Sequence, residues 1–361
     1  EGYLAEQKAG QILYRGVFGT QKPGGWLSNA FDFRLKNIAN TNVIYWGDKL
    51  LALWEAAQPH RLDPATLETL GLDDLDGLLQ PGSAFAAHPR IDPRCDRDQG
   101  AACLVNFSLK AGLSSTITLY EFSPAGKLLR QYATVVPGFC FIHDFVITPN
   151  YCIFFQNPVT FNPLPFALGM RGAGECITFQ PGQPTQVIVI PRQGEDQRQP
   201  ANGTKLEVSS GFVFHHANAF EDGNEIVIDS ICYQTLPAVE PDSDFRQTNF
   251  EVLDPGQLWR FRLQLETGKT QQQMIDPRCC EFPTIHPDRV GRDYRYLYMA
   301  AAHAATGNAP NQAIIKRDLT SGEQQLWSAA PRGFVTEPVF VPQPGGVAED
   351  DGWLLVLVFD A

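Results

Sequence analysis

Three histidines stand far apart in the chain, each within or beside a strand-like run of residues. They are His88 in AAHPRIDP, His143 in FCFIHDFVIT and His215 in FVFHHANAF. Neutral imidazole is a common ligand of transition metals, and its second ring nitrogen usually donates to a carboxylate or a carbonyl. The three residues are therefore candidate metal ligands, although a single histidine in an apolar strand is more often a satisfied core residue.

Three glutamates occur in similar surroundings. They are Glu55 in LLALWEAAQPH, Glu281 in CCEFPTIHP and Glu337 in FVTEPVFVP. An acidic side chain within an apolar run costs free energy unless it is paired or faces water from an edge strand. A hydrogen bond from a ligand imidazole would give each carboxylate a partner and would fix the ring. A site of two histidines and one carboxylate is the alternative, and sequence spacing leaves both arrangements open.

A segment without charge follows the second histidine. Between Asp144 and Arg171 the chain has no charged residue, and the segment ends in PVTFNPLPFALGM. Its prolines argue against a transmembrane helix. The segment is either a buried strand followed by an apolar loop, or an exposed patch that dips into a membrane or admits a lipid-like substrate. The candidates for this patch are Phe161, Leu164, Phe166 and Leu168.

The elements that must position these residues are predicted to be β-strands. Short runs such as STITLYEF, QVIVIPR and NEIVIDSICY recur along the chain, and turn-forming residues bound many of them. Residues 62–79 are the best candidate for a helix, or for a loop with a short helix. An all-β chain of this kind folds as a pair of sandwiches, a large barrel or a propeller.

The spacing of the marked residues favours the propeller. His143 follows His88 by 55 residues, and His215 follows His143 by 72 residues. A four-stranded propeller blade takes about 40–50 residues, and more with long loops. One marked residue on the innermost strand of each blade would bring all of these side chains to the central axis.

Composition limits the partners of the chain. The net charge is -12 over 361 residues and no basic run is present, which argues against nucleic acid as a main partner. The eight cysteines include no C-x-x-C pair. Several of them lie in apolar runs, as buried free thiols do, and this favours a reducing cytoplasm.

Seven stretches together resemble the carotenoid cleavage oxygenase family. They are FGTQKPGG, NIANTNVIYWGDKLLALWEAAQPHRLDP, AHPRIDP, FIHDFVIT, FVFHHANAFE, CEFPTIHP and TEPVFVP. One such stretch alone would be weak, but their joint presence in the family's order is specific and covers nearly the whole chain. The resemblance implies a seven-bladed β-propeller, with residues 1–361 as one domain and a non-haem Fe(II) on the central axis.

The family holds iron with four histidines, and the resemblance assigns roles to the residues above. The matching ligands are His88, His143 and His215, and the glutamates expected to bond to ligand imidazoles are Glu55, Glu281 and Glu337. The family's fourth histidine follows the strand at which this chain stops. We therefore expect that the domain is truncated at both ends, that terminal strands are missing, and that this chain alone binds iron poorly.

The resemblance also implies an activity. It is the oxidative cleavage of a polyene double bond of apocarotenoids, with O2 as co-substrate and aldehydes such as retinal as products. An apolar polyene needs an aromatic tunnel, for which Trp54, Phe141 and Phe214 are candidates. Trp54 and Phe214 adjoin site residues and would point away from the site on an ideal strand, so their role requires a bend. The apolar segment would place the enzyme in the cytoplasm, bound peripherally to a membrane.

Other functions remain compatible with the residues. The same iron site serves retinoid isomerases and stilbene-cleaving oxygenases, which differ in the shape of the tunnel. A propeller that binds a ligand without catalysis is an alternative from another class. A zinc hydrolase is a further one, because three histidines also suit zinc.

Overall fold

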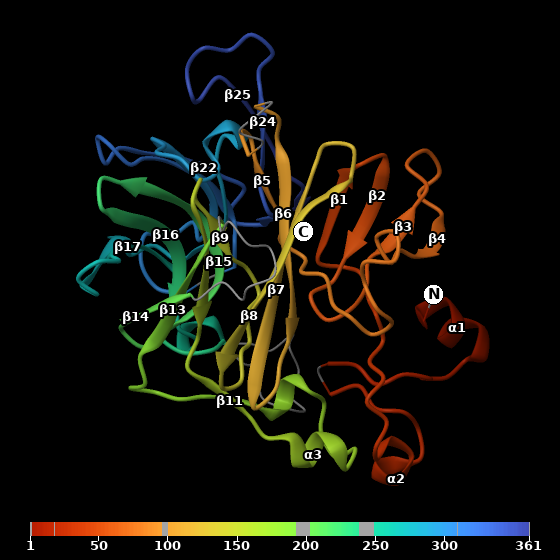
Figure 1. Ribbon diagram of the computed structural model, residues 1–361. Helices are drawn as coiled ribbons and strands as arrows, with labels where there is room; N and C mark the ends of the chain where they lie inside the picture. Colours follow the sequence, from red (N-terminus) through yellow and green to blue (C-terminus); the bar gives the residue numbers. More distant parts are fainter. Residues whose placement is uncertain are drawn as a thin grey trace.

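Nearly all regular structure in the chain is antiparallel β-sheet. The computed structural model describes residues 2–17, 19–95, 100–192, 203–237, 249–308 and 310–360. Within these residues, five four-stranded sheets follow one another along the chain, as the blades of a β-propeller do (Figure 1). The all-β propeller fold is thus confirmed, while the described residues complete five blades of the seven that were predicted.

The blades are numbered here in chain order. Blade 1 consists of β1 (Asn42–Trp46), β2 (Lys49–Leu53), β3 (His60–Leu62) and β4 (Thr69–Leu72). Blade 2 consists of β5 (Arg90–Asp92), β6 (Cys103–Lys110), β7 (Ser114–Phe122) and β8 (Leu128–Pro137). Blade 3 consists of β9 (Val146–Ile147), β10 (Tyr151–Gln156), β13 (Thr185–Pro191) and β14 (Thr204–Val208).

Two further blades and three strand pairs complete the sheets. Blade 4 consists of β15 (Phe212–Asp222), β16 (Glu225–Tyr233), β17 (Gln257–Gln264) and β18 (Thr270–Asp276). Blade 5 consists of β19 (Cys280–Thr284), β20 (Tyr296–Ala301), β21 (Ala313–Asp318) and β22 (Gln324–Ser328). The pairs are β11 (Val159–Phe161) with β12 (Ile177–Phe179), β23 (Gly333–Val335) with β26 (Val358–Asp360), and β24 (Val339–Pro342) with β25 (Gly352–Leu355).

The helices are short and lie outside the blades. They are α1 (Gly2–Ala9), α2 (Gly25–Asn29) and α3 (Pro163–Ala167), with single turns of 3-10 helix at Gly174–Cys176, Phe250–Val252 and Pro287–Arg289. In Figure 1, α2 and α3 lie together at one end of the molecule, and the backbone N–H of Phe31 donates to the carbonyl of Ala167 at 2.7 Å.

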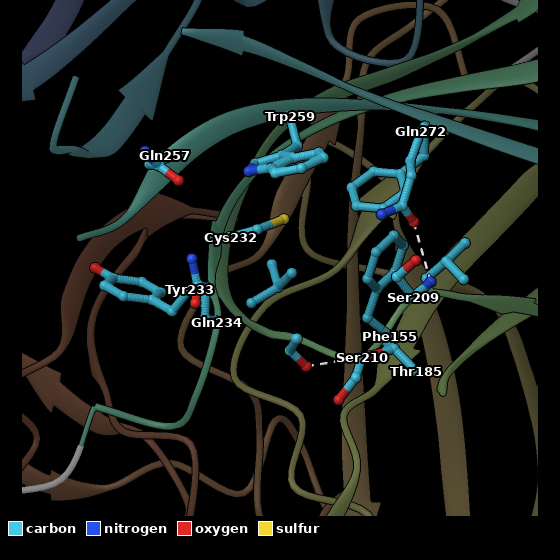
Figure 2. A pocket seen from close by; sticks show the side chains of 14 residues that line it. Phe155, Thr185, Ser209, Ser210, Cys232, Tyr233, Gln234, Gln257, Trp259 and Gln272 are labelled. Atoms are coloured by element: carbon cyan, nitrogen blue, oxygen red, sulfur yellow. Dashed lines mark hydrogen bonds between the residues drawn. The ribbon is translucent and has the colours of Figure 1, made fainter. Parts of the chain in front are cut away.

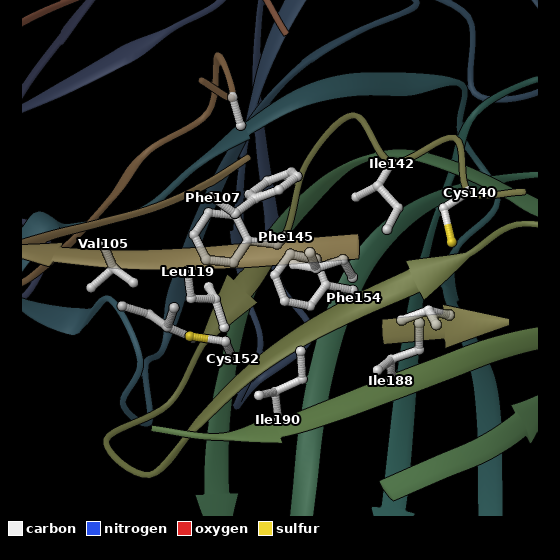
Figure 3. Close-up of a cluster of buried hydrophobic side chains, with 14 residues drawn as sticks. Val105, Phe107, Leu119, Cys140, Ile142, Phe145, Cys152, Phe154, Ile188 and Ile190 are labelled. Carbon is white, nitrogen blue, oxygen red and sulfur yellow. The ribbon is translucent and has the colours of Figure 1, made fainter. Parts of the chain in front are cut away.

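The hydrophobic core is divided into clusters that lie between consecutive blades. Figure 3 shows the cluster between blades 2 and 3, where Phe107 of β6 meets Phe154 of β10 with ring centroids 5.1 Å apart. A second cluster joins Phe155 of blade 3 to Phe261 of blade 4, with ring centroids 5.2 Å apart. Strands β10 and β13 are buried on both faces and read as continuous apolar runs, whereas β8 alternates between buried and exposed residues.

Buried ion pairs also join the blades. Arg192, which follows β13, donates to Asp92 of β5 at 2.7 Å and to Glu121 of β7 at 2.9 Å. All three side chains are nearly inaccessible to solvent. A buried charge persists only when it is paired and hydrogen-bonded, so this triad fixes blade 3 against blade 2.

Two sequence-based expectations are wrong in detail. Residues 62–79 contain no helix; they form the end of β3, strand β4 and turns in which Leu67, Leu75 and Asp76 have positive φ. Cys95 and Cys103 form a disulfide across the start of blade 2, whereas the expectation was of free thiols. The other six cysteines form no disulfide within the described residues.

Candidate metal centre

The three candidate ligands lie on, or just before, the innermost strands of three consecutive blades. His88 stands two residues before β5, His143 three residues before β9, and His215 lies within β15. Each of these strands is the edge of its sheet in the order of hydrogen-bonded neighbours. Side chains from such edges meet at the centre of a propeller, which explains why residues so far apart in sequence converge.

The imidazoles meet within the reach of one metal ion. Nε2 of His88 lies 2.9 Å from Nε2 of His143, and one ring nitrogen from each of the three histidines lies within 4.8 Å of the others. The ring centroids are 4.6 to 5.1 Å apart. Metal–nitrogen bonds about 2.1 Å long at right angles would separate two ligand nitrogens by roughly 3 Å, so the spacing fits a shared ion.

Burial keeps the first of these imidazoles neutral. It lowers the pKa of His88 to about 3 and outweighs the opposing charge of Asp144, while His143 and His215 add smaller effects in the direction of burial. A neutral ring carries the lone pair that a metal needs. The donor set is therefore three nitrogen ligands with no anionic group among them.

Glu281 holds the ring of His215 from behind. Nδ1 of His215 lies 2.7 Å from Oε2 of Glu281 on β19. The hydroxyl of Tyr233 donates to Oε1 of the same carboxylate at 2.8 Å, and the backbone N–H of Phe282 donates to Oε2 at 2.7 Å. Because the carboxylate can only accept, Nδ1 carries the proton and Nε2 keeps its lone pair for a metal.

Glu55 stands behind His143 in a looser arrangement. Its Oε1 lies 3.5 Å from Nδ1 of His143, and its Oε2 accepts from the hydroxyl of Thr41 at 3.3 Å. Burial alone would raise the pKa of Glu55, but the charge and proximity of His143 outweigh it, so the pKa is lowered. Nδ1 of His143 is buried and has no hydrogen-bond partner within the described residues, which leaves Glu55 as its nearest carboxylate.

Glu337 acts on the site through its charge: the pKa of His215 is raised against the effect of burial, mainly by Glu281, and Glu337 adds to this. It is an exposed residue just before β24, whereas Glu55 is partly buried and Glu281 is buried. Its assignment to a ligand imidazole stays a prediction.

A bulge in β15 brings Phe214 toward the site. The register between β15 and β16 shifts between Val213 and His216, so Phe214 and His215 do not simply alternate between opposite faces. The ring of Phe214 packs edge-on to His143 at 5.5 Å and against Phe212 at 4.6 Å. The bend that the tunnel assignment of Phe214 required is therefore present.

The other two tunnel candidates differ in their positions. Phe141 joins the same aromatic group through Phe212, with ring centroids 5.9 Å apart. Trp54 is buried, with 4 % of its surface exposed, and its backbone forms an isolated β-bridge with Phe85. No ring contact in the described part of the chain joins the Trp54 side chain to the histidines.

Phe282 is a site residue that sequence reasoning missed. Its ring lies 5.2 Å from that of His215, and its backbone has a φ of 54°, which is uncommon for a bulky residue. The register of β19 shifts between Glu281 and Thr284, next to this residue. Because of this irregular backbone, the Glu281 carboxylate and the Phe282 ring both contact His215. No local pattern in CCEFPTIHP predicts the shift in register.

A cavity of about 250 Å³ opens between blades 3 and 4 (Figure 2). Its lining combines aromatic rings with amide and hydroxyl groups, and includes Phe155, Ser210, Tyr233, Trp259 and Gln272. None of the three histidines or of the three predicted tunnel residues lines it. The cavity touches the metal centre only through Tyr233, which bonds to Glu281.

The predicted apolar patch is exposed in part. Leu164 of α3 is 64 % exposed, whereas Phe161, Phe166 and Leu168 are half-buried. The nearby N-terminal segment adds large exposed side chains, namely Trp26, Leu27 and Phe31. The buried Arg15 guanidinium ties the two segments by donating to the carbonyls of Asp32 at 2.7 Å and Phe166 at 3.0 Å. No helix in the described ranges is long and apolar enough to cross a membrane.

Comparison with known proteins agrees with this architecture. The sequence profile of the retinal pigment epithelial membrane protein family matches residues 1–361. Apocarotenoid-15,15'-oxygenase of Synechocystis is 59% identical over 361 residues, which cover 100% of this chain and 72% of that protein. Lignostilbene-alpha,beta-dioxygenase isozyme III of Sphingomonas paucimobilis is 28% identical over 374 residues, covering 99% of this chain and 72% of the relative.

Solved structures show the same fold. A glutamate-to-glutamine variant of Synechocystis apocarotenoid oxygenase superposes with a TM-score of 0.95 at 59% identity, covering 100% of this chain and 74% of the other. A cobalt-substituted form of the Synechocystis protein gives a TM-score of 0.95 as well, with 99% of this chain and 74% of the other covered. The chain therefore belongs to the retinal pigment epithelial membrane protein family, the carotenoid oxygenases.

Proposed function

We propose that this protein is a non-haem Fe(II) dioxygenase that cleaves a polyene double bond of apocarotenoids and releases aldehydes such as retinal. The observation that carries the proposal is the convergence of three imidazoles on one point in a chain 59% identical throughout to an apocarotenoid-15,15'-oxygenase. If the three histidines lay far apart in the structure, membership of the family alone would not support an oxygenase activity.

The residues fit an iron ion held by histidine. His88, His143 and His215 present nitrogen donors, and the carboxylates of Glu55 and Glu281 lie at Nδ1 of His143 and of His215 respectively. This favours histidine ligation over a site with a carboxylate ligand, because both glutamates already have an imidazole partner. Fe(II) bound there supplies the binding and activation of O2.

The protein's own part is to orient the polyene and keep water away from it. Phe214 and Phe212 form an aromatic wall that touches His143, and Phe282 covers His215 on another side. Aromatic faces suit a flat conjugated chain, since they offer a large apolar area with little loss of side-chain entropy. These side chains would hold one double bond of the polyene beside the metal.

The exposed apolar side chains on α2 and α3 support peripheral attachment to a membrane. Trp26 is 56 % exposed, Leu27 is 72 % exposed and Leu164 is 64 % exposed, and all three belong to segments tied together by Arg15. Apolar groups that protrude from short helices insert between lipid head groups, where carotenoid-derived substrates also partition.

The decisive experiment measures metal and turnover together in the full natural protein. The protein is loaded with Fe(II) without oxygen, mixed with an apocarotenal, and then exposed to O2. We expect loss of polyene absorbance and formation of aldehydes only with both iron and O2, and we expect the His215→Ala variant to lose both iron and bleaching. Iron binding without O2-dependent bleaching would contradict an oxygenase and favour a propeller that only binds a ligand.

A second candidate function is cleavage of a stilbene. It is favoured by relatives named resveratrol cleavage oxygenase 1, from Aspergillus fumigatus, and lignostilbene-alpha,beta-dioxygenase, each 28% identical to this chain. A hydroxylated stilbene offered in the same assay separates the two substrates, and a higher kcat/KM for the stilbene would overturn the assignment to apocarotenoids.

A further inference from the structure

The residues next to the three histidines form a second network behind the metal centre. Arg90 lies two residues after His88, Asp144 directly follows His143, and His216 directly follows His215. On a strand, neighbouring side chains point to opposite faces, so the residues that follow a ligand directly turn away from the axis. They enter the narrow space where the inner edges of blades 2, 3 and 4 meet.

Arg90 and Asp144 join all three edges. Nη2 of the Arg90 guanidinium donates to Oδ2 of Asp144 at 2.6 Å and to the carbonyl of His216 at 2.9 Å. Its Nε donates to the carbonyl of Phe145 at 2.8 Å. Oδ2 of Asp144 also accepts from the backbone N–H of His216 at 2.8 Å, and Oδ1 accepts from the N–H of Phe145 at 2.7 Å.

The hydrogen bonds of Arg90 and Asp144 connect the three inner edges, as backbone hydrogen bonds connect the strands within a sheet. The strands β5, β9 and β15 are sheet edges, so their inner backbone groups have no neighbouring strand to pair with. The Asp144 side chain is 2% exposed and that of Arg90 is 18% exposed. A planar guanidinium with several fixed donors can hold three acceptors at once, which a lysine ammonium on a flexible stem does poorly.

We infer that Arg90 and Asp144 are positioning residues for the metal: by locking the backbones beside His88, His143 and His215 they set the separation of the three imidazoles. The inference deepens the proposed function, because it concerns the same metal site. Its consequence is that affinity for the metal, and the geometry around it, depend on a charge pair that touches neither the metal nor a ligand ring.

The chain contains a matched control pair. Arg260 of β17 donates to Asp229 of β16 through two bonds of 2.8 Å, with side chains 19% and 0% exposed. This pair has the same chemistry and similar burial, but its ion pair joins β16 to β17 within blade 4 and bonds to no backbone group next to a candidate ligand. Its contact with β15 is at Phe220, five residues beyond His215. The variants Arg90→Lys and Arg260→Lys should therefore lose similar stability and differ in metal binding.

Cobalt is a suitable probe, because a cobalt-substituted form of a relative exists and Co(II) reports its ligand geometry by absorption. Co(II) is titrated into the full natural protein and into each variant, and unfolding by denaturant is measured without metal. We expect Arg90→Lys to raise the dissociation constant of Co(II) 10- to 100-fold and to shift its ligand-field bands, as the loss of outer partners of a metal site does. Arg260→Lys should bind Co(II) like the unsubstituted protein.

Two results would overturn the inference. Unchanged affinity and bands in Arg90→Lys would make the pair a structural brace only, and an equal loss of affinity in both variants would tie the effect to general destabilisation. If Arg90→Lys does not fold, Asp144→Asn is measured in the same way with Asp229→Asn as its control. Absence of Co(II) binding by the unsubstituted protein would instead remove the metal site itself, and the proposed function with it.

Discussion

The hydroxyl of Tyr233 offers a direct test of how far the metal centre extends. It donates to Oε1 of Glu281 at 2.8 Å, and the other oxygen of that carboxylate holds Nδ1 of His215. Burial, together with the nearby Glu281 carboxylate, raises the pKa of Tyr233, so the phenol stays a proton donor. Tyr233→Phe deletes one donor and preserves the aromatic ring.

The expected loss has two separate parts. A hydrogen bond to a charged group contributes about 1.5–3 kcal/mol, so the apo protein should lose about that much free energy of unfolding. Glu281 then keeps only His215 and the N–H of Phe282 as partners, and the imidazole is held less firmly. Changes to the outer partners of metal ligands lower metal affinity by about 10- to 100-fold, and we expect the lower end, because the direct Glu281–His215 bond survives.

Tyr294→Phe is the matched control. The hydroxyl of Tyr294 is likewise buried and donates to a carboxylate, that of Asp229, at 2.6 Å. Denaturant unfolding without metal and Co(II) titration of both variants separate stability from metal affinity. We expect similar losses of stability and a weaker affinity for Co(II) in Tyr233→Phe alone. Equal Co(II) affinity in the two variants would refute the idea that Tyr233 acts on the metal through Glu281.

Four further outcomes are expected. Removal of the metal with a chelator should lower the melting temperature, and added Co(II) should restore it, because binding to the folded state alone stabilises it; a melting temperature indifferent to chelation would contradict a bound metal. Phe214→Ala should raise KM for an apocarotenal more than it lowers kcat, since the ring forms an apolar wall beside His143; a fall in kcat alone would be at odds with that role. Leu27→Asp combined with Leu164→Asp should weaken sedimentation with liposomes, whereas Val347→Asp, at an exposed site between β24 and β25, should not; unchanged binding in the double variant would count against the patch. Burial would raise the pKa of Asp92, but Arg192 and Arg292 outweigh it and lower the pKa, so the stability from this carboxylate is present above about pH 4 and is lost as the pH falls through its folded pKa. The difference in unfolding free energy between the protein and Asp92→Asn should therefore shrink in acid, and a constant difference from pH 7 to pH 3 would argue against the pair.

The sequence was sufficient to predict the class of fold and the positions of the histidines. Recurrent apolar runs separated by turns indicated an all-β protein. The sequence separations between the three histidines are each longer than one blade, which predicted one histidine on each of three blades. Alternation along a strand also accounts for the way Asp144 and His216 face away from the site. Asp144 bonds to Arg90, and Nδ1 of His216 lies 2.7 Å from the hydroxyl of Ser230, on the side away from the metal.

Irregular backbone accounts for what the sequence did not reveal. The bulges near His215 and Glu281 depend on how each strand pairs with its neighbour, and no residue type marks them. They decide that Phe214 and Phe282 lie on the ligand rings, which strict alternation denies. In the same way, the leucines of residues 62–79 are spaced as in a helix, but Leu67, Leu70 and Leu72 are exposed, so their spacing does not report a buried face.

The alternation that sends an imidazole to the axis of the propeller also sends the next side chain into the seam between blades. A charge there is costly unless a partner reaches it from another blade, and Asp144 is 2% exposed with Arg90 as its partner. An acidic residue directly after a candidate ligand in an apolar strand is therefore informative: it implies a cation from a neighbouring edge. In this chain the cation stands two residues after another candidate ligand, so the spacing of the ligands and the pairing of the charges follow from one arrangement of strands.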